Sequence, residues 1–371
     1  MIKSDILFTG YYGQQNTGDD AFVEVASWGA KHYWSKDKIR FLAKEDKLPK
    51  TVTSVRGYPI TVPRTYYLQQ QILLNNTDYL ISAGGSTLHS KLPIKSVKKL
   101  AIDLKGKGKN IKLGAIGVSI GPFKSIEDEK AVQEYLKNID FIALRDQRSF
   151  EYVKSIDTPY EPVNAFDLAA LLPKIYNYEK KALILKSKKI IGVSICPVES
   201  ILKGVDILKE KKRNKMVVEL LKEIDKNTDI HFKFFIINGS HKNGDYKLTK
   251  ETIEKVRPKS YDVVEYSRDT KKIWKSVAEC DFVLSTRLHA AIFACFAEVP
   301  FMLNEYHRKC IDFLDDVGYS GQYRLGNSEY DIIDKAKEII NILDNPQQYQ
   351  LPNRLETMKI MAEKNFTKII L

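Results

Sequence analysis

Cysteine is scarce in this sequence, which has four cysteines in 371 residues. None of them shows C-x-x-C spacing, and three lie in apolar surroundings, where a thiol behaves as a small core residue. The four are Cys196, Cys280, Cys295 and Cys310. The scarcity and the spacing argue against a disulfide framework and against a structural zinc site.

Long apolar runs are also missing. No run approaches the roughly 18 residues that a membrane-spanning helix needs. Residues 1–4 lead directly into an expected strand, and no signal peptide precedes it. We therefore expect a cytoplasmic protein.

Acidic residues are outnumbered. The sequence has 59 Lys and Arg against 47 Asp and Glu, a net charge of +12, which favours anionic partners. The lysines are scattered, however, and the densest runs are short: residues 95–99, 105–109 and 209–215. Solvated surface explains such a distribution better than a nucleic-acid interface does. We expect no nucleic-acid partner.

What the sequence has in abundance is one repeated unit: a short apolar run, a polar or glycine-bearing turn, and an amphipathic helix. Several of the runs are apolar almost throughout, as strands buried on both faces are, which predicts mostly parallel sheets. The expected strands of the first half are residues 5–10, 39–43, 78–83, 111–120 and 140–146. Those of the second half are residues 189–195, 230–238, 263–266, 281–285 and 300–304.

The order of these units predicts an α/β fold of two doubly wound, Rossmann-like domains that face each other across a cleft. We place the N-terminal domain at residues 1–175 and the C-terminal domain at 186–345, with a charged connector over 173–188. A last helical segment occupies 346–371. The sequence leaves open whether that segment stays with the second domain or crosses back to the first.

In such sheets ligands bind beyond the carboxyl ends of the strands, so the turns that follow the strands are informative. The first is "GYYGQQNTGDDAF", residues 10–22. Its glycines do not match G-x-G-x-x-G, and Asp19 and Asp20 would repel a bound phosphate. Asp19 either caps the helix or holds a sugar hydroxyl as a general base, and Gly13 and Asn16 belong to the same candidate acceptor loop.

The second turn is "ISAGGSTLHS", residues 81–90. Gly84 and Gly85 allow close approach of the backbone to a ligand or serve packing alone, and Ser86 or Thr87 is a suitable cap for the following helix. We interpret Gly84, Gly85 and Ser86 as candidate acceptor contacts.

The third turn is "FIALRDQRSF", residues 141–150. Arg145 stands at the strand end, beside Asp146, which either caps the next helix or pairs with it. The guanidinium forms a structural ion pair or presents its planar fork to a carboxylate or phosphate. Both interpretations remain open at this point.

The fourth turn, in "DFVLSTRLHAA", residues 281–291, gives the strongest signal. Ser285 or Thr286 is a suitable cap, and Arg287 and His289 then fall in the first helical turn. Cations there oppose the helix dipole unless an anion completes the site, and a histidine beside them transfers protons near neutral pH. Lys309 lies at the next strand end. These residues predict an anion-binding acid/base site.

Taken in order, several blocks resemble the polysaccharide pyruvyl transferase family over residues 5–318. They are "GYYGQQNTGDDAF", "ISAGGSTL", "GVSIGPF", "FIALRDQRS", "NAFDLAALL", "IGVSICP" and "DFVLSTRLHAAIFACFAEVPFMLNEYHRKCIDFL". The resemblance implies a glycosyltransferase B architecture. It also implies transfer of a pyruvyl group from phosphoenolpyruvate to a sugar, with formation of a ketal on a glycan or its lipid-linked precursor.

The resemblance also assigns roles. Arg287 and His289 match the family's donor-binding and catalytic positions, and Arg145 is placed like an arginine proposed to hold the donor. Asp19 falls on the family's "GD" after the first strand, and Lys309 on the lysine after its last core strand. We expect His289 and Asp19 to be catalytic, and we expect the donor to be held by Arg287, Arg145 and Lys309, beside Ser285 and Thr286. Asp20 joins Asp19 as a candidate to polarise the acceptor hydroxyl. No metal or other cofactor is expected, because the cations and the helix terminus supply the charge that phosphoenolpyruvate needs.

Two other interpretations stay open. A glycosyltransferase with a nucleotide-sugar donor uses the same kind of cleft, and a non-catalytic anion- or glycan-binding protein can share the fold. Under the pyruvyl transferase interpretation the charge of +12 has a use, since it draws a soluble enzyme to the anionic inner face of the membrane, where lipid-linked acceptors lie.

Overall fold

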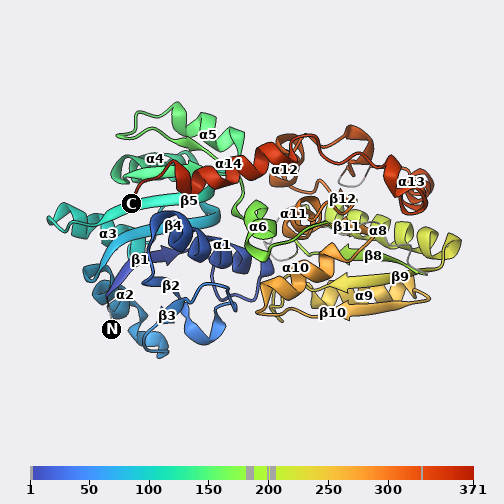
Figure 1. Cartoon of the computed structure of the whole chain (residues 1–371), viewed down its shortest axis with the longest axis horizontal. Helices are drawn as coiled ribbons and strands as arrows, with labels where there is room; N and C mark the ends of the chain where they lie inside the picture. Colours follow the sequence, from blue (N-terminus) through green and yellow to red (C-terminus); the bar gives the residue numbers. More distant parts are fainter. Residues whose placement is uncertain (1–2, 181–187, 199, 201–205, 327–328) are drawn as a thin grey trace. The chain divides into compact units, whose positions relative to one another are not determined.

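The computed structural model describes residues 3–180, 188–198, 200, 206–326 and 329–371. The chain divides into two units. The first comprises Met1–Gln14, Asp19–Ile175 and Glu356–Leu371, and the second comprises Gln15–Gly18 and Tyr176–Leu355. Figure 1 is coloured along the sequence, so the return of the C-terminal segment is visible: the red helix α14 (Leu355–Thr367) lies among the blue and green elements of the first unit. Each unit is described in turn.

The first unit is built on a seven-stranded sheet in which every neighbouring pair is parallel. The order is β3-β2-β1-β4-β5-β6-β7. The strands are β1 Ser4–Thr9, β2 Ile39–Lys44, β3 Arg56–Tyr58, β4 Thr77–Leu88, β5 Lys112–Ile120, β6 Phe141–Leu144 and β7 Val163–Asn164. The predicted parallel α/β sheet is confirmed, with the short edge strands β3 and β7 as additions.

Helices cover both faces of this sheet (Figure 1). They are α1 Thr17–Trp34, α2 Tyr66–Asn75, α3 Val97–Gly106, α4 Ile126–Asn138, α5 Gln147–Lys154, α6 Leu172–Tyr176 and α14. Short 3-10 turns lie at η1 Glu45–Lys47, η2 Pro63–Thr65 and η3 Leu168–Leu171. Ser96 caps α3 and Ser125 caps α4, each accepting a hydrogen bond from an amide in the first turn.

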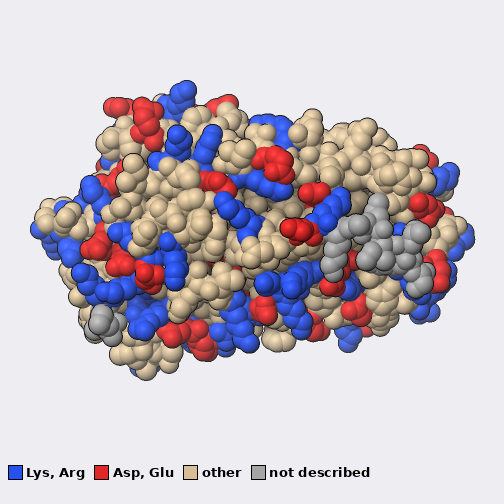
Figure 2. All heavy atoms as spheres, viewed as in Figure 1, with Lys and Arg blue, Asp and Glu red and all other residues tan. Residues whose placement is uncertain are grey.

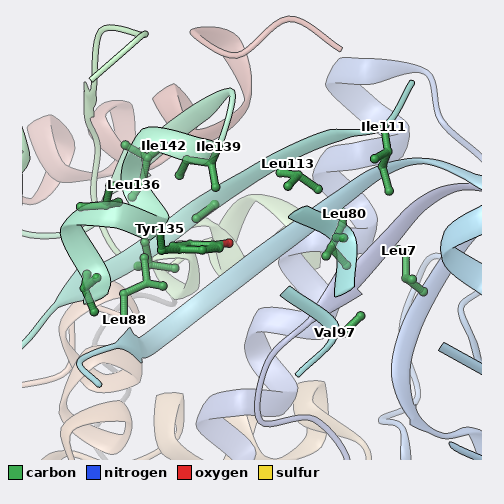
Figure 3. Close-up of a cluster of buried hydrophobic side chains, with 14 of the residues drawn as sticks. Leu7, Leu80, Leu88, Val97, Ile111, Leu113, Tyr135, Leu136, Ile139 and Ile142 are labelled. Atoms are coloured by element: carbon green, nitrogen blue, oxygen red, sulfur yellow. The ribbon is translucent and has the colours of Figure 1, made fainter. Parts of the chain in front are cut away.

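The core of the first unit lies between the sheet and its helices (Figure 3). Leu80, Leu113 and Ile142 from three neighbouring strands are 3% exposed or less, and Leu136 from α4 packs with them. Runs that are apolar at consecutive positions suit strands covered on both faces, because alternate side chains point to opposite sides. This burial fixes the register and so the position of each strand end.

α14 completes the first unit. The indole Nε1 of Trp34 donates to the carbonyl oxygens of Phe366 and Ile369, at 3.0 and 2.9 Å. Asn365, fully buried, accepts from the amide of Gly117 and donates to the carbonyl of Phe166. Because buried polar groups need partners, these bonds tie the helix to the first sheet.

The second unit holds a five-stranded sheet, also parallel throughout, in the order β10-β9-β8-β11-β12. Its strands are β8 Lys189–Ser194, β9 Ile230–Phe235, β10 Tyr261–Val264, β11 Phe282–Ser285 and β12 Phe301–Leu303. Its helices and turns are α8 Ile207–Asn227, α9 Tyr246–Val256, α10 Thr270–Ala278, α11 Leu288–Phe296, α12 Arg308–Asp316, η4 Gly321–Tyr323, α13 Ile332–Asp344 and η5 Pro346–Gln348.

Each sheet contains a point where the strand order reverses. In the first sheet this lies between β1 and β4, and in the second between β8 and β11. Crevices at such points, beyond the carboxyl ends of the strands, are the usual ligand sites of open α/β sheets. The turns after β1, β4, β8 and β11 are therefore the places to look for chemistry.

On the face drawn in Figure 2, Lys and Arg are interspersed with Asp and Glu. A distribution of both signs agrees with solvated helix faces and loops. Among the residues that the structure describes, no helix has the length and apolar composition needed to cross a membrane.

Candidate active site

The seam between β11 and α11 holds the predicted pair. β11 ends at Ser285, and Arg287 is the N-cap residue of α11, with no side-chain capping bond. His289 is the second residue of that helix, and every other residue of the helix is buried. A helix with an almost wholly apolar surface must be packed on all sides, so His289 is its one position with partial exposure.

Ser285 and Thr286 do not cap the helix, and this part of the prediction is wrong. The Ser285 hydroxyl donates to the carbonyl oxygen of Arg287 at 2.6 Å, and the Thr286 amide donates to the carbonyl oxygen of Ser194 in β8. Both side chains are buried. These two hydrogen bonds fix the backbone between β11 and α11 at the switch point between β8 and β11. The N-cap position is taken by Arg287, whose side chain cannot accept a hydrogen bond.

Arg287 has a partner that the sequence did not indicate, Asp245 at the start of α9. The guanidinium Nε lies 3.0 Å from Oδ1 and 3.2 Å from Oδ2 of Asp245, and Nη2 donates to Oδ1 as well. The Asp245 carboxylate is fully buried and also accepts from the amide of Asn238. Burial raises the pKa of Asp245, and the charge and hydrogen bonds of Arg287 oppose that rise.

This ion pair orients the guanidinium. Asp245 engages Nε and Nη2, and the structure gives Nη1 no hydrogen bond among the described residues. Arginine has five donors in a planar fork, so the edge that carries Nη1 keeps donors that Asp245 does not use. The Arg287 side chain is 18% exposed. Asp245 therefore acts as the residue that positions Arg287.

His289 lies against a segment from the first βα turn. Residues 15–18 belong to the second unit: the Thr17 amide donates to the carbonyl of Ile237 at 2.9 Å, and the Gly239 amide donates to the carbonyl of Gln15 at 2.7 Å. These bonds place Gly18 so close to His289 that a Cβ at Gly18 would overlap the imidazole Nδ1. Only glycine leaves room for the ring in this position.

Asn16, and not Asp19, lies at the N-cap position of α1. The Asn16 side chain accepts from the Gly18 amide at 3.1 Å, so Asn16 caps α1 and the capping role considered for Asp19 is wrong. Asp19 and Asp20 lie in the first turn of α1, Asp19 partly exposed and Asp20 fully buried. Of the two carboxylates, Asp19 is the one that solvent and ligands can reach.

Lys309 is accompanied by a second buried arginine. The Lys309 Nζ lies 5.9 Å from the centre of the Tyr306 ring, and the guanidinium carbon of Arg213 lies 5.2 Å from the centre of the same ring. Arg213, 2% exposed, donates to the carbonyl of Cys196 at 3.0 Å, just beyond β8. Aromatic faces attract cations at such distances, so Tyr306 holds both near the carboxyl end of the second sheet.

The pKa of the buried Cys196 thiol is influenced by the positive charge at the carboxyl end of the second sheet. Burial raises its pKa, and Arg287, Arg213 and Lys309 act in the opposite direction. Three cations therefore converge on the carboxyl ends of β8, β11 and β12, where the switch point of the second sheet lies. Arg213 was not predicted, because it stands within a run of lysines that was interpreted as solvated surface.

Arg145 lies in the first unit and forms an internal ion pair. Its Nη1 lies 3.0 Å from Oδ2 of Asp167, its Nε donates to Ser119 at 2.6 Å, and its Nη2 donates to Ser86. Arg145 is 7% exposed and Asp167 is 4% exposed. Asp146 does not pair with it but caps α5 by accepting from Ser149. Of the two interpretations, the structure displays the ion pair, and donor contact by Arg145 stays a prediction.

The Gly84-Gly85 turn is not a helix start. β4 continues through it to Leu88, and α3 is capped by Ser96, so the capping role predicted for Ser86 or Thr87 is wrong. Gly84 has φ of +74°, and a Cβ there would overlap the Phe22 ring of α1. Close packing of α1 on β4 explains this glycine. The Ser86 hydroxyl accepts a hydrogen bond from Arg145 Nη2. Gly13 lies in the turn after β1, with φ of +70°.

Replacing Gly18 by alanine tests the packing around His289. We expect any reaction that uses the His289 side chain to slow at least about tenfold, because an added methyl displaces the imidazole and small misplacements of reacting groups are costly. The unfolding temperature should also fall, because the added methyl overpacks a buried contact. Gly106→Ala, at the end of α3 with open space around it, is the matched control and should keep full turnover. Equal activity of the two variants would contradict the proposed contact.

The fold defines the class of protein. Two parallel, doubly wound sheets form a glycosyltransferase B-like α/β architecture, and solved structures of that class match almost the whole chain. A putative UDP-N-acetylglucosamine 2-epimerase from Listeria monocytogenes is 12% identical, with a TM-score of 0.58 over 99% of this chain and 91% of that one. The UDP-GlcNAc 2-epimerase from Methanocaldococcus jannaschii is 12% identical, with a TM-score of 0.57 over 96% and 97%.

The wall teichoic acid polymerase TagF, as its H444N variant, is 12% identical, with a TM-score of 0.52 over 99% of this chain and 87% of that one. No curated protein matches the sequence. The model of the family described as polysaccharide pyruvyl transferase matches residues 15–308. The chain belongs to the polysaccharide pyruvyl transferase family, as the sequence blocks predicted.

Proposed function

We propose that this protein transfers the pyruvyl group of phosphoenolpyruvate to two hydroxyls of a saccharide, forming a pyruvyl ketal. One observation carries the proposal: in a member of this family, Arg287 at the N-cap of α11 and His289 in its first turn stand together at the switch point of the second sheet. An anion-binding fork beside a proton-transfer group is what the reaction requires.

The charge at the second sheet end suits the donor. Phosphoenolpyruvate carries a carboxylate and a phosphate, and Arg287, Lys309 and the amides at the start of α11 offer matching donors. Arg213 adds a third cation behind Tyr306. Preorganised positive charge in a partly buried site also stabilises the phosphate as it leaves.

The proposed reaction balances without a redox step. C3 of phosphoenolpyruvate takes a proton, and the oxygen of one sugar hydroxyl forms a bond to C2. The oxygen of the second hydroxyl then bonds to C2 as the C2–O bond to phosphate breaks and inorganic phosphate departs. Of the two hydroxyl protons, one is balanced by the new C–H bond and the other by the phosphate.

His289 has the proton-transfer role in this scheme, since imidazole gives and takes protons near neutral pH. Asp19 polarises the acceptor hydroxyl, because its carboxylate is the more exposed of the pair in the first turn of α1. Arg145 adds charge for the donor, although its guanidinium also serves Asp167.

Replacing Arg287 by lysine should raise the KM for phosphoenolpyruvate by about tenfold or more and change kcat less. Lysine keeps the charge but loses the planar fork that contacts Asp245 and the donor together. The measurement is steady-state phosphate release against phosphoenolpyruvate concentration. Arg308→Lys, at an exposed neighbour of Lys309 paired with Asp312, is the control. An unchanged KM in Arg287→Lys would remove the donor-binding role.

The direct test is to incubate the protein with phosphoenolpyruvate and a panel of sugar glycosides. The proposal expects phosphate release that depends on the acceptor, and a product with the mass and acid lability of a pyruvyl ketal. Phosphate release without an acceptor product, or no reaction with any glycoside or lipid-linked saccharide, would contradict it.

A nucleotide-sugar glycosyltransferase is the second candidate. One observation favours it: the fold matches structures described as a co-structure of Staphylococcus aureus MnaA with UDP and as a Neisseria meningitidis UDP-GlcNAc 2-epimerase bound to UDP-GlcNAc. The Arg287 edge that suits a carboxylate also suits a diphosphate. Thermal stabilisation by UDP-sugars but not by phosphoenolpyruvate would select this candidate, because a ligand of the folded state raises the unfolding temperature.

A further inference from the structure

An unusual set of apolar side chains is exposed on the first unit, between β3 and the end of α2. Ile60 is 53% exposed, Val62 52% and Leu68 57%, and Tyr67 and Ile72 are 39% and 41% exposed. Single exposed apolar residues need no explanation, whereas several within one short stretch mark a surface with a partner. We call these five residues the 60–72 patch.

The patch is held in position and is not a loose loop. The buried side chain of Gln69 accepts from the amide of Ile60 at 2.9 Å and donates to its carbonyl oxygen at 2.8 Å. The Tyr66 hydroxyl donates to the carbonyl of Thr61, and the Thr65 hydroxyl donates to that of Val62. These bonds fix residues 60–62 to α2 and keep the side chains of Ile60 and Val62 exposed.

α2 presents a second apolar side to solvent. Its buried residues Gln69, Leu73 and Leu74 face the sheet, where Leu73 and Leu74 join the core. Leu68 and Ile72, four residues apart, lie together on the opposite side of the helix. An ordinary surface helix carries charged residues there, but α2 has no charged residue at all.

The segment that carries the patch has basic residues and no acidic ones. Between residues 47 and 77 the sequence has no Asp or Glu, but it has Lys47, Lys50, Arg56 and Arg64. All four of these basic residues are exposed. The nearest preceding acids, Glu45 and Asp46, lie in η1, where Asp46 pairs with Lys47 and Glu45 accepts from Gly57. A hydrogen-bonded apolar patch on a segment whose exposed charges are all basic is complementary to an anionic, partly apolar partner.

We propose that the 60–72 patch is the surface by which this protein docks on an anionic lipid bilayer. Apolar side chains insert at the headgroup boundary, a tyrosine suits that boundary, and basic residues are attracted to anionic lipids. A nucleic-acid surface fits less well, because the side chains of Leu68, Ile72 and Ile60 have no donor or charge that could bind a phosphate. A purely protein interface does not explain why acidic residues are missing over 31 consecutive positions, 47–77.

The docking surface deepens the proposed function without depending on it. If the acceptor is a lipid-linked saccharide, the docked first unit meets its substrate at the membrane. Vesicle binding is measured without phosphoenolpyruvate, so its failure and the failure of pyruvyl transfer are separate results.

The test is flotation of the full-length protein with two kinds of vesicle, phosphatidylcholine alone and equal parts of phosphatidylcholine and phosphatidylglycerol. We expect binding to the anionic vesicles that weakens between about 0.1 M and about 1 M salt. Leu68→Glu/Ile72→Glu should reduce the partition coefficient at least about tenfold. Lys50→Gln/Arg64→Gln should reduce it less and weaken its dependence on salt.

Ile126→Glu/Ile360→Glu is the matched control. These two positions are 66% and 63% exposed on α4 and α14 of the same unit, so the variant has the same change of charge outside the patch. It should bind like the unmodified protein. All variants are compared for thermal unfolding, which changes at exposed positions should leave nearly unaltered.

Three results would overturn the proposal. They are no binding to anionic vesicles, equal loss of binding in the patch and control variants, and binding that survives Leu68→Glu/Ile72→Glu. Light scattering identifies a fourth: a dimer that the patch variant converts to monomer while vesicle binding stays unchanged. That result would assign the patch to contact between two copies of the chain.

Discussion

Replacing His289 by glutamine is expected to lower kcat by about 10²- to 10⁴-fold, the range that proton transfer by a positioned side chain contributes. Glutamine is near in size and keeps hydrogen-bonding groups against Gly18, but it cannot carry a proton between the acceptor hydroxyl and C3. The KM for phosphoenolpyruvate should change much less, because the Arg287 fork is intact. The measurement is phosphate release at saturating donor and acceptor.

His241→Gln is the matched control for this experiment. His241 is exposed in the same unit and stacks on Tyr246. Its replacement should leave kcat unchanged, and both variants should unfold at nearly the temperature of the unmodified protein. Turnover of His289→Gln within a factor of about two of the unmodified protein would remove His289 from the mechanism.

The second large effect is expected from Asp245→Ala. Removal of one partner from a buried ion pair leaves the other charge uncompensated and costs about 3 kcal/mol or more of unfolding free energy. The Arg287 side chain also loses the carboxylate that orients it, so the KM for phosphoenolpyruvate should rise by about tenfold or more. Urea unfolding and donor-dependent kinetics measure the two effects.

Two further variants separate stability from positioning. Asp245→Asn keeps the size of the side chain and an acceptor oxygen for Arg287, so it should recover part of the stability and part of the donor affinity. Asp229→Ala removes an exposed carboxylate from its pair with Lys188 and should alter neither. If Asp245→Ala loses stability but keeps the donor KM, the ion pair is structural and does not position Arg287 for the donor.

The strand ends were predictable because the physics there is local. Apolar runs such as those of β1 and β11 belong to strands buried on both faces, and the residue after each run must stand at the carboxyl edge of a parallel sheet. Arg287 and His289 follow β11 directly, so their place at the switch point could be inferred from the sequence. The short edge strands β3 and β7 could not, since two or three residues carry no periodic signal.

The partners of the charged residues were less predictable, for one common reason. Asp146 adjoins Arg145 in sequence, but the guanidinium pairs with Asp167, and Arg287 pairs with Asp245, which lies 42 residues earlier. Choice of partner depends on which loops the sheets bring together. A carboxylate next to an arginine also has a local alternative, and Asp146 takes it by capping α5.

The role of Gly18 was also unpredictable, because it depends on a residue that is distant in sequence. Glycine at the second position of a helix has no local cause, and the sequence offered only the failed G-x-G-x-x-G spacing as a way to interpret it. Its cause is the imidazole of a residue 271 positions later, which occupies the space of a side chain. Spacing rules for phosphate loops could not have found a glycine that makes room for a histidine.

The return of α14 to the first unit bears on the order in which the chain can fold during synthesis. Domains generally fold as units as the chain emerges from its N-terminus. Here Trp34 and Gly117 are made before Tyr176–Leu355 of the second unit, but the residues that satisfy their buried donors, Asn365, Phe366 and Ile369, are made after it. The first unit therefore cannot complete its core until the second unit has been synthesised.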